Sequence, residues 1–457
     1  MRKYFCGLEA ISPVDGRYRD RVERLRKYFS EESLIRYRIR VELEYWMFFH
    51  ERILKKRILA TRKRRLRGWY KDFDLRDARK VKEWEKITNH DVKAVEYFLR
   101  EKMRKGHIKG EEWLHFGLTS EDVNNLAFGL ALKGAMKKIV VPEIEKLCSS
   151  LRRKILRSKR AVMLARTHGQ VAVPTTMGKE LAVFLLRIQG CLKKLKKVEI
   201  EGKLNGAVGN YNALNFVFPK KNWIKYGKEF VTKMRLKPAL VTTQILHGDS
   251  YIRMFSELSL LNSITIGLCQ DLWRYVGDGY FKLKVVEGEV GSSTMPQKVN
   301  PIDFENGEGS LGMANSILRY FEEKLPISRL QRDLSDSTVK RNMGLALAYC
   351  ILGYQSCTRG LEKLSVDRIT MKKEVESHWE VITEGVQTLF RREGKSGVYE
   401  ELLRISRGRH IGKREWEEVS KKLGLSRKME RQLKKLTPLG YVGLAEKLTS
   451  KVLRSLK

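Results

Sequence analysis

The segment Gly291-Ser-Ser-Thr-Met-Pro-Gln-Lys-Val-Asn-Pro301 has the residue types best suited to chemistry in this chain. Glycine at one end and prolines at the other, with no apolar period between them, predict a loop able to open and close over a ligand. Lys298 and Asn300 would supply hydrogen-bond donors for a carboxylate or an oxyanion. A serine of this loop, Ser292 or Ser293, could act as a base only where its alkoxide is strongly stabilised, and nothing in the spacing shows this, so a flexible surface loop stays open as the alternative.

A turn near the N-terminus places a guanidinium beside a phenol. Pro13 and Asp15-Gly16 predict the turn, and the next residues are Arg17 and Tyr18. Such a pair can hold a phosphate through charge-assisted hydrogen bonds. An exposed turn with a surface arginine explains the same residues equally well.

A polar cluster at residues 89–91 precedes an apolar helical pattern over residues 92–98. The pattern predicts a helix that begins after the cluster, where backbone N–H groups and the helix dipole favour anions. Asn89, His90 and Asp91 are therefore candidates for contact with an anionic ligand. Capping of the helix by Asn or Asp is the simpler alternative, and for His90 alone we favour a structural role.

His168 lies in Arg166-Thr-His-Gly-Gln170, another polar segment between apolar stretches. Histidine is the side chain best suited to deliver a proton near neutral pH, and the adjacent Gly169 permits unusual backbone geometry. From the residues alone, a buried and hydrogen-bonded histidine is the favoured alternative.

The elements that must position these residues are long helices. Apolar residues recur at spacings of three and four while period-two alternation is rare, which predicts an all-α fold. These stretches are 123–131, 181–198, 255–272, 313–318 and 345–355. Helices this long need partners along their length, which indicates a bundle and burial against other subunits. We expect an N-terminal helical domain (1–112), a central long-helix bundle (113–365) with the loop at 287–301, and a C-terminal helical domain (366–457).

Composition excludes several classes of protein. The 457 residues include six cysteines with no Cys-x-x-Cys pair, which argues against a disulfide framework or a zinc site. No apolar run approaches the roughly 18 to 20 residues of a membrane span. The basic start of the chain is not followed by the apolar block of a secretory signal. We therefore expect a cytoplasmic protein with no membrane contact.

The formal net charge of +38 is unusual. Nine Lys or Arg and no acid lie between Arg52 and Arg67, and such a field would attract polyanions. The excess is nevertheless spread along the whole chain, and charge alone identifies no binding module. We do not expect a dedicated nucleic-acid site.

Taken together, these segments resemble the fumarase/aspartase superfamily, whose signature loop Gly-Ser-Ser-x-Met-Pro-x-Lys-x-Asn-Pro is matched from Gly291 to Pro301. Within it, the chain resembles the adenylosuccinate lyases, particularly the bacterial type, from about residue 9 to the C-terminus. The segments that carry this resemblance are Ser12–Tyr18, Thr88–Phe98, Thr119–Asp122, Arg166–Gln170, Asn205–Asn212, Gln331–Arg341 and Thr437–Gly443.

The resemblance implies a three-domain, all-α lyase whose central helices form a homotetramer core. Each active site would be assembled from three subunits. The implied reaction is β-elimination, which cleaves adenylosuccinate to AMP and fumarate and SAICAR to AICAR and fumarate. No cofactor or metal is expected.

The resemblance also implies residue roles. Ser293 would take the proton from the succinyl β-carbon, and His168 would protonate the departing nitrogen, with His90 nearby as a helper. The nucleotide's phosphate and ribose would be held by Arg17, Tyr18, Arg332, Ser337 and Arg341. Asn89, His90 and Asp91 would line the nucleotide side. The succinyl carboxylates would be bound by Thr119, Ser120, Gln244, Lys298 and Asn300. Fixed cations and amide donors suit this chemistry, because proton removal adds a negative charge to an already anionic substrate.

The chain departs from the adenylosuccinate lyase pattern in three places. Gln297 stands where His is usual, Val171 replaces the Pro that commonly follows His-Gly-Gln, and residues 246–250 differ in type and length. Met-Pro-Gln-Lys is familiar from argininosuccinate lyases, which makes that enzyme, or another superfamily lyase, the first alternative. The phosphate-type set argues against it, because argininosuccinate carries no phosphate. A basic nucleic-acid-binding relative without activity is the second alternative, and the intact Ser293, His168 and Lys298 argue against that.

Overall fold

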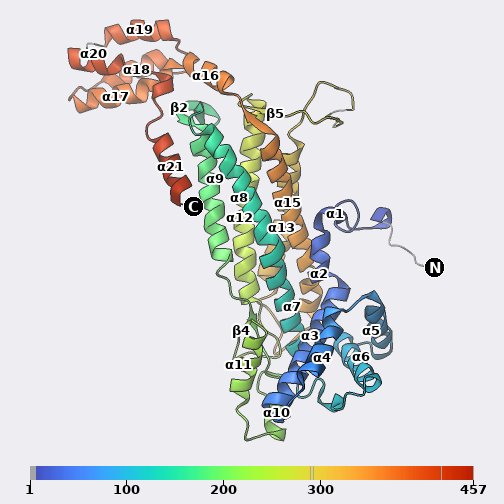
Figure 1. Ribbon diagram of the computed structural model, residues 1–457. Helices are drawn as coiled ribbons and strands as arrows, with labels where there is room; N and C mark the ends of the chain where they lie inside the picture. The colour runs from blue at the N-terminus through green and yellow to red at the C-terminus, as the bar shows by residue number, and fades with distance from the viewer. Residues whose placement is uncertain (1–6, 289, 292, 424, 456–457) are drawn as a thin grey trace. The chain divides into compact units, whose positions relative to one another are not determined.

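Helices make up most of the chain, which confirms the all-α prediction (Figure 1). The computed structural model describes residues 7–288, 290, 291, 293–423 and 425–455. Its chain contacts divide into two compact units. Unit 1 comprises Met1–Ile144, Cys191–Asn262 and Ser310–Leu352, and unit 2 comprises Glu145–Gly190, Ser263–Gly309 and Gly353–Lys457. The three-domain division expected from the sequence stays a prediction.

Five long helices contribute residues to both units: α8 (Val141–Ser158), α9 (Met177–Leu195), α12 (Asp249–Gly277), α13 (Ile302–Lys324) and α15 (Met343–Lys363). Four of them, with α7 (Ser120–Ala135), contain the five apolar stretches identified in the sequence. The stretch at 181–198 is three residues too long, because α9 ends at Leu195. None of the described helices is long and apolar enough to cross a membrane.

Unit 1 contains the N-terminal helices and a set of short elements. Its other helices are α1 (Arg19–Val22), α2 (Arg26–Phe29), α3 (Glu31–Arg52), α4 (Ala60–Lys71), α5 (Leu75–Thr88), α6 (Asp91–Lys105), α10 (Asn212–Val217), α11 (Trp223–Lys233) and α14 (Ser335–Lys340). Strands β3 (Glu201–Gly202) and β4 (Lys237–Pro238) pair in parallel.

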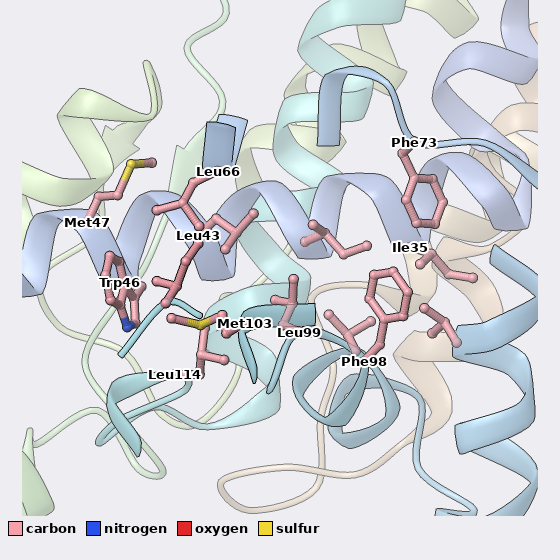
Figure 2. Packing of buried hydrophobic residues seen from close by; sticks show 14 of the residues in the cluster. Ile35, Leu43, Trp46, Met47, Leu66, Phe73, Phe98, Leu99, Met103 and Leu114 are labelled. Atoms are coloured by element: carbon pink, nitrogen blue, oxygen red, sulfur yellow. The ribbon is translucent and has the colours of Figure 1, made fainter. Parts of the chain in front are cut away.

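Helix α3 organises the core of unit 1 because its apolar residues repeat every four positions. Ser30 caps its start by accepting a hydrogen bond from the Ser33 N–H at 3.2 Å. Figure 2 shows side chains from α3 packed with others from α4 and α6. The labelled residues are Ile35, Leu43, Trp46, Met47, Leu66, Phe73, Phe98, Leu99, Met103 and Leu114. This core fixes α6, whose first residue, Asp91, and cap residue, His90, are candidate site residues.

Unit 2 contains the hairpin of β1 (Val162–Thr167) and β2 (Gln170–Thr176) and the C-terminal helices. Those helices are α16 (Arg368–Ser377), α17 (Thr383–Arg392), α18 (Val398–Ser406), α19 (Lys413–Lys422), α20 (Arg427–Leu433) and α21 (Ala445–Ser455). Strands β5 (Phe281–Leu283) and β6 (Leu364–Val366) are antiparallel. Leu164 of the hairpin packs in one buried apolar cluster with residues of α16, α17 and α18, such as Val375, Val386 and Leu402.

Candidate functional site

The first turn of α6 is organised by His90. Its Nδ1 accepts a hydrogen bond from the backbone N–H of Lys93 at 3.1 Å. The predicted helix is present and begins at Asp91, the last residue of the polar cluster. Its cap is His90, in agreement with the structural role favoured for this residue alone, so the alternative of capping by Asn or Asp is wrong. Asn89 ends α5 in the left-handed conformation, with φ of 48°, so the extended residue that follows it becomes the cap of α6.

His90 also joins α6 to α7, because its Nε2 lies 3.3 Å from Ser120 Oγ. An imidazole whose Nδ1 accepts from an amide carries its hydrogen on Nε2 when it is neutral. Nε2 is therefore the donor and Ser120 Oγ the acceptor. Two helix N-termini, each favourable to anions, meet at this contact.

Asp91 is held between two guanidiniums. Its Oδ2 lies 2.5 Å from Arg38 Nη2 and 3.0 Å from Arg341 Nη2. Arg38 is only 1% exposed, and its Nε donates to Asn124 Oδ1 at 2.8 Å. Burial raises the pKa of the Asp91 carboxyl, but Arg38 and Arg341 outweigh it and leave the pKa below its usual value. Arg341 is fixed from a second side by Glu31 at 2.8 Å.

Glu121 holds two cations of the 332–341 segment. Its carboxylate accepts from Arg332 Nη1 at 3.0 Å and from Lys340 Nζ at 3.4 Å. Lys340 Nζ also lies 2.6 Å from Asp336 Oδ2, and this ion pair joins two residues of α14, the short helix that carries Ser337. Burial lowers the pKa of Lys340, but the two carboxylates outweigh it and raise the pKa above its usual value. The buried Glu121 therefore orients Arg332 and anchors α14.

The remaining candidates of unit 1 lie on turns. Thr119 is the N-cap residue of α7, as its Thr-Ser-Glu-Asp sequence predicts. The predicted turn at the N-terminus is present, with Gly16 N–H donating to the Ser12 carbonyl at 3.0 Å. Arg17, which follows it, is exposed, while Tyr18 is half-buried. A pocket of about 600 Å³ is lined by residues of the 12–30 segment and by Arg341, Asn342 and their neighbours.

His168 occupies the tip of the β1–β2 hairpin of unit 2. His168 and Gly169 have φ values of 53° and 77°, and Thr167 pairs with Gln170 across them, as in a two-residue type I′ turn. The segment was expected only as a polar stretch between helices, so the hairpin is a correction. His168 is exposed in the single chain, which differs from the buried histidine favoured from the residues alone.

The loop of unit 2 is exposed at Ser293 and Lys298 and half-buried at Asn300. Asn300 Nδ2 donates to the Gly291 carbonyl, which ties the two ends of the loop together. A Cβ on Gly291 would lie 1.8 Å from the Lys298 carbonyl oxygen, so this close approach requires glycine. Ser292 and Glu289, within the segment 287–301, lie outside the described residues.

The structure thus brings part of the predicted set into direct contact. His90 meets Ser120, and Asp91 meets Arg341. Within the described residues, Arg17, Tyr18, Gln244 and Ser337 make no side-chain hydrogen bond to another candidate. His168, Ser293, Lys298 and Asn300 belong to unit 2.

Sequence reasoning missed the charged residues beneath the site. Arg38, Glu121 and Lys340 are all buried; Arg38 holds Asp91, Glu121 holds Arg332, and Lys340 pairs with Glu121 and Asp336. Arg38 could have been noticed, because it shares the apolar face of α3 with Ile35 and Ile39. The partners of Glu121 lie more than 200 positions away, which no local pattern reveals.

Comparison with known proteins places this chain in a family. A family model described as "Lyase" matches residues 16–315, and one described as "Adenylosuccinate lyase C-terminal" matches residues 328–442. The adenylosuccinate lyase of Haemophilus influenzae is 42% identical over 450 residues, covering 97% of this chain and 99% of its own. That of Escherichia coli K12 is 41% identical over 444 residues, covering 96% and 97%. The chain belongs to the adenylosuccinate lyase family.

Solved structures agree on the fold. A fumarate lyase from Mesorhizobium sp. BNC1 superposes with a TM-score of 0.76 at 17% identity, covering 94% of this chain and 97% of that one. The 3-carboxy-cis,cis-muconate lactonizing enzyme from Pseudomonas putida gives 0.74 at 19% identity, covering 94% and 96%. Gln297 suggested an argininosuccinate lyase as the alternative. The relatives from Haemophilus influenzae and Escherichia coli are both adenylosuccinate lyases, so this alternative loses its support.

One departure from the family pattern has a physical explanation. Val171 pairs with Arg166, next to the Thr167–Gln170 pair that closes the turn. In a two-residue hairpin the pair that closes the turn is hydrogen-bonded, and antiparallel pairs alternate between hydrogen-bonded and non-hydrogen-bonded. The Arg166–Val171 pair is therefore non-hydrogen-bonded, and the backbone N–H of residue 171 is not needed for pairing with β1. Proline and valine are both compatible with such a position, and we expect Val171 to leave the hairpin unchanged.

Proposed function

We propose that this protein cleaves adenylosuccinate to AMP and fumarate by β-elimination, and SAICAR to AICAR and fumarate by the same chemistry. The observation that carries the proposal is the meeting of two helix N-termini at His90 and Ser120 beside two arginines, one held by the buried Glu121 and one by the half-buried Asp91. This arrangement suits a substrate with a phosphate at one end and two carboxylates at the other.

The nucleotide end would be bound in unit 1. Arg332 donates to Glu121 and Arg341 donates to both Asp91 and Glu31, and each guanidinium keeps other N–H groups for the phosphate. Arg17, Tyr18 and Ser337 would complete this end. Asn89 and Asp91 would line the nucleotide side, with Asp91 acting chiefly through its hold on Arg341.

The succinyl end would be bound by Thr119, Ser120, Gln244, Lys298 and Asn300. Ser293 would remove the β-carbon proton as the C–N bond breaks, and the developing negative charge would be spread toward the cations and amide donors around the carboxylates. His168, exposed at its hairpin tip, would give a proton to the departing nitrogen. His90 donates through Nε2, so it would assist as a neutral hydrogen-bond donor.

We propose a homotetramer with active sites shared between subunits. Support comes from apolar side chains left exposed on the long helices, such as Leu186 of α9 (48%), Trp273 of α12 (49%) and Met313 of α13 (49%). Light scattering after size-exclusion chromatography tests this proposal, and a monomer at micromolar concentration would contradict it. Cytoplasmic location is supported by five free, buried cysteines among the described residues.

The test of the activity is fumarate release from adenylosuccinate by the purified protein. We expect His168→Asn to lose about 100-fold or more in kcat, since general acid catalysis contributes about 10² to 10⁴. His107→Asn is its matched control, because His107 is also exposed and has φ of 52°. Asn adopts the left-handed conformation readily, so both variants preserve the turn.

Ser293→Ala tests the base, with Ser396→Ala at another exposed position of unit 2 as control. Near-full activity of the Ser293 and His168 variants would overturn the proposed base and acid. Release of fumarate from argininosuccinate but not from adenylosuccinate would overturn the proposed substrate.

A further inference from the structure

The turn that carries Thr119 and Ser120 rests on a buried ion pair between Asp122 and Lys203. Both side chains are fully buried, and Lys203 Nζ lies 3.1 Å from Asp122 Oδ1. Asp122 Oδ2 also accepts from the Thr119 N–H at 3.0 Å. The charge of this carboxylate therefore fixes the backbone at the start of α7 from inside the protein.

The same carboxylate holds a second segment, the loop at residues 205–209. Asp122 accepts from the backbone N–H groups of Asn205 and Gly206, each at 3.1 Å. Lys203 Nζ donates to the Gly206 carbonyl at 3.0 Å. One buried acid thus locks the loop onto the turn of α7.

The loop in turn contacts the segment 242–244. Asn205 Nδ2 donates to Thr242 Oγ1 at 2.8 Å, and Asn205 is 1% exposed. A Cβ on Gly209 would lie 2.1 Å from the Thr242 carbonyl oxygen, so the two backbones touch. Gly209 also has φ of 86°, which only glycine adopts readily. The loop is therefore an adaptor between α7 and residue 242.

Gln244 completes the chain of contacts. Its Nε2 donates to the Ala207 carbonyl at 2.9 Å. A side-chain amide has two hydrogens on this nitrogen, so the contact fixes the orientation of the amide and leaves one hydrogen for a ligand carboxylate. The position of Gln244 depends on the loop that holds Ala207.

We propose that Asn205 and Thr242 are positioning residues for the succinyl end of the site. Their hydrogen bond keeps Gln244 in register with Thr119 and Ser120, which lie 124 or more positions earlier in the sequence. Neither residue touches the substrate. The inference rests on the proposed function, because it assigns Gln244 to a succinyl carboxylate.

The adjacent threonines provide a matched test. Thr242→Val removes the hydroxyl that accepts from Asn205, whereas Thr243→Val removes a buried hydroxyl that has no hydrogen-bond partner. The two substitutions make the same chemical change at neighbouring positions. Thr242→Ser keeps the hydroxyl and should restore the wild-type behaviour.

The measurements are the KM for adenylosuccinate and product inhibition by fumarate and by AMP. We expect Thr242→Val to raise the KM and the fumarate inhibition constant about three- to ten-fold, the effect of one lost hydrogen bond. The AMP inhibition constant should change less than about two-fold, because the nucleotide residues are held elsewhere. Thr243→Val and Thr242→Ser should match the wild type.

Equal behaviour of Thr242→Val and Thr243→Val would overturn the inference. So would an equal loss of AMP and fumarate affinity, which would indicate general loosening instead of a specific positioning role. If Thr242→Val does not fold, Asn205→Ala removes the same link from the other side and faces the same criteria. A wild-type protein that releases no fumarate would contradict the proposed function, whereas an active wild type with insensitive variants would contradict only the positioning role.

Discussion

Removal of the two partners in the Asp122–Lys203 pair should have unequal consequences. In Lys203→Met the carboxylate loses its cation but keeps three backbone N–H donors, from Thr119, Asn205 and Gly206. In Asp122→Asn the lysine loses its counter-charge, and at least one backbone donor faces an amide NH2 group instead of an oxygen. We therefore expect the Asp122 variant to be the less stable.

The magnitudes follow from the contacts. Breaking a buried ion pair costs about 3–5 kcal/mol, and the three remaining charge-assisted hydrogen bonds place Lys203→Met near the lower end. Asp122→Asn adds one or two unsatisfied buried N–H groups at about 1–3 kcal/mol each. We expect about 3 kcal/mol for Lys203→Met and about 5 kcal/mol or more for Asp122→Asn. The double variant should cost less than the sum, because no isolated charge remains.

The assay is guanidinium chloride unfolding followed by tryptophan fluorescence, at one fixed protein concentration because an oligomer's stability depends on concentration. Where the variants share the same dependence of unfolding free energy on denaturant concentration, their unfolding midpoints can be compared directly. A Lys203→Met variant that is as unstable as Asp122→Asn would refute the reasoning. It would mean that the cation, and not the set of backbone donors, accounts for the stability of this buried carboxylate.

Two further predictions concern side-chain contacts of histidines, and a third concerns the net charge. His90→Asn should keep the cap of α6 but lose the contact with Ser120, so amide hydrogen exchange at residues 91–95 should stay slow while kcat falls. His90→Ala removes a cap worth about 1 kcal/mol and should accelerate this exchange. Equal exchange in both variants would contradict the capping role. Burial lowers the pKa of His115, but the charge and hydrogen bond of Glu42 outweigh it and raise the pKa above its usual value. The stability from this pair should be full below about pH 6.5 and lost as the pH rises through the folded-state pKa. The urea midpoint difference between wild type and His115→Asn should therefore shrink from pH 6 to pH 9, and a constant difference would contradict the pair's role. Finally, added salt should lower kcat/KM for adenylosuccinate and leave kcat unchanged, because the net charge of +38 attracts an anionic substrate; a salt-independent kcat/KM would refute this.

The helices could be predicted from the sequence because their apolar residues follow the helical period over many turns. The β1–β2 hairpin could not. Burial along β1 does not alternate, and the register shifts between Leu164 and Arg166, so the strand has no period-two signal. Its polar tip was identified as a candidate segment, but its geometry was not.

The candidate residues came from the sequence, some from their types and spacing and the others from the resemblance, whereas the residues that hold them came only from the structure. Ser120 and Glu121 are adjacent, yet Ser120 is half-buried beside His90 and Glu121 is buried against Arg332 and Lys340. Neighbouring residues on a helix point about 100° apart, so one turn can face a ligand and the interior at once. Whether a residue from Thr119 to Asp122 faces the ligand or the interior depends on partners far away in the chain.

The distribution of buried charge separates the site from the overall positive charge. Among the described residues, nine buried acids stand against four buried Lys or Arg. The acids are Glu42, Glu44, Glu96, Glu121, Asp122, Glu143, Asp303, Asp336 and Asp367, and the bases are Arg38, Lys154, Lys203 and Lys340. The positive excess is therefore a property of the surface, where it attracts any anion without selecting among them. Selection needs cations in fixed positions, and a guanidinium is fixed when a carboxylate holds one of its edges, as Glu121 holds Arg332 and Asp91 holds Arg341. In this very basic chain, it is the acids that give the predicted anion site its geometry.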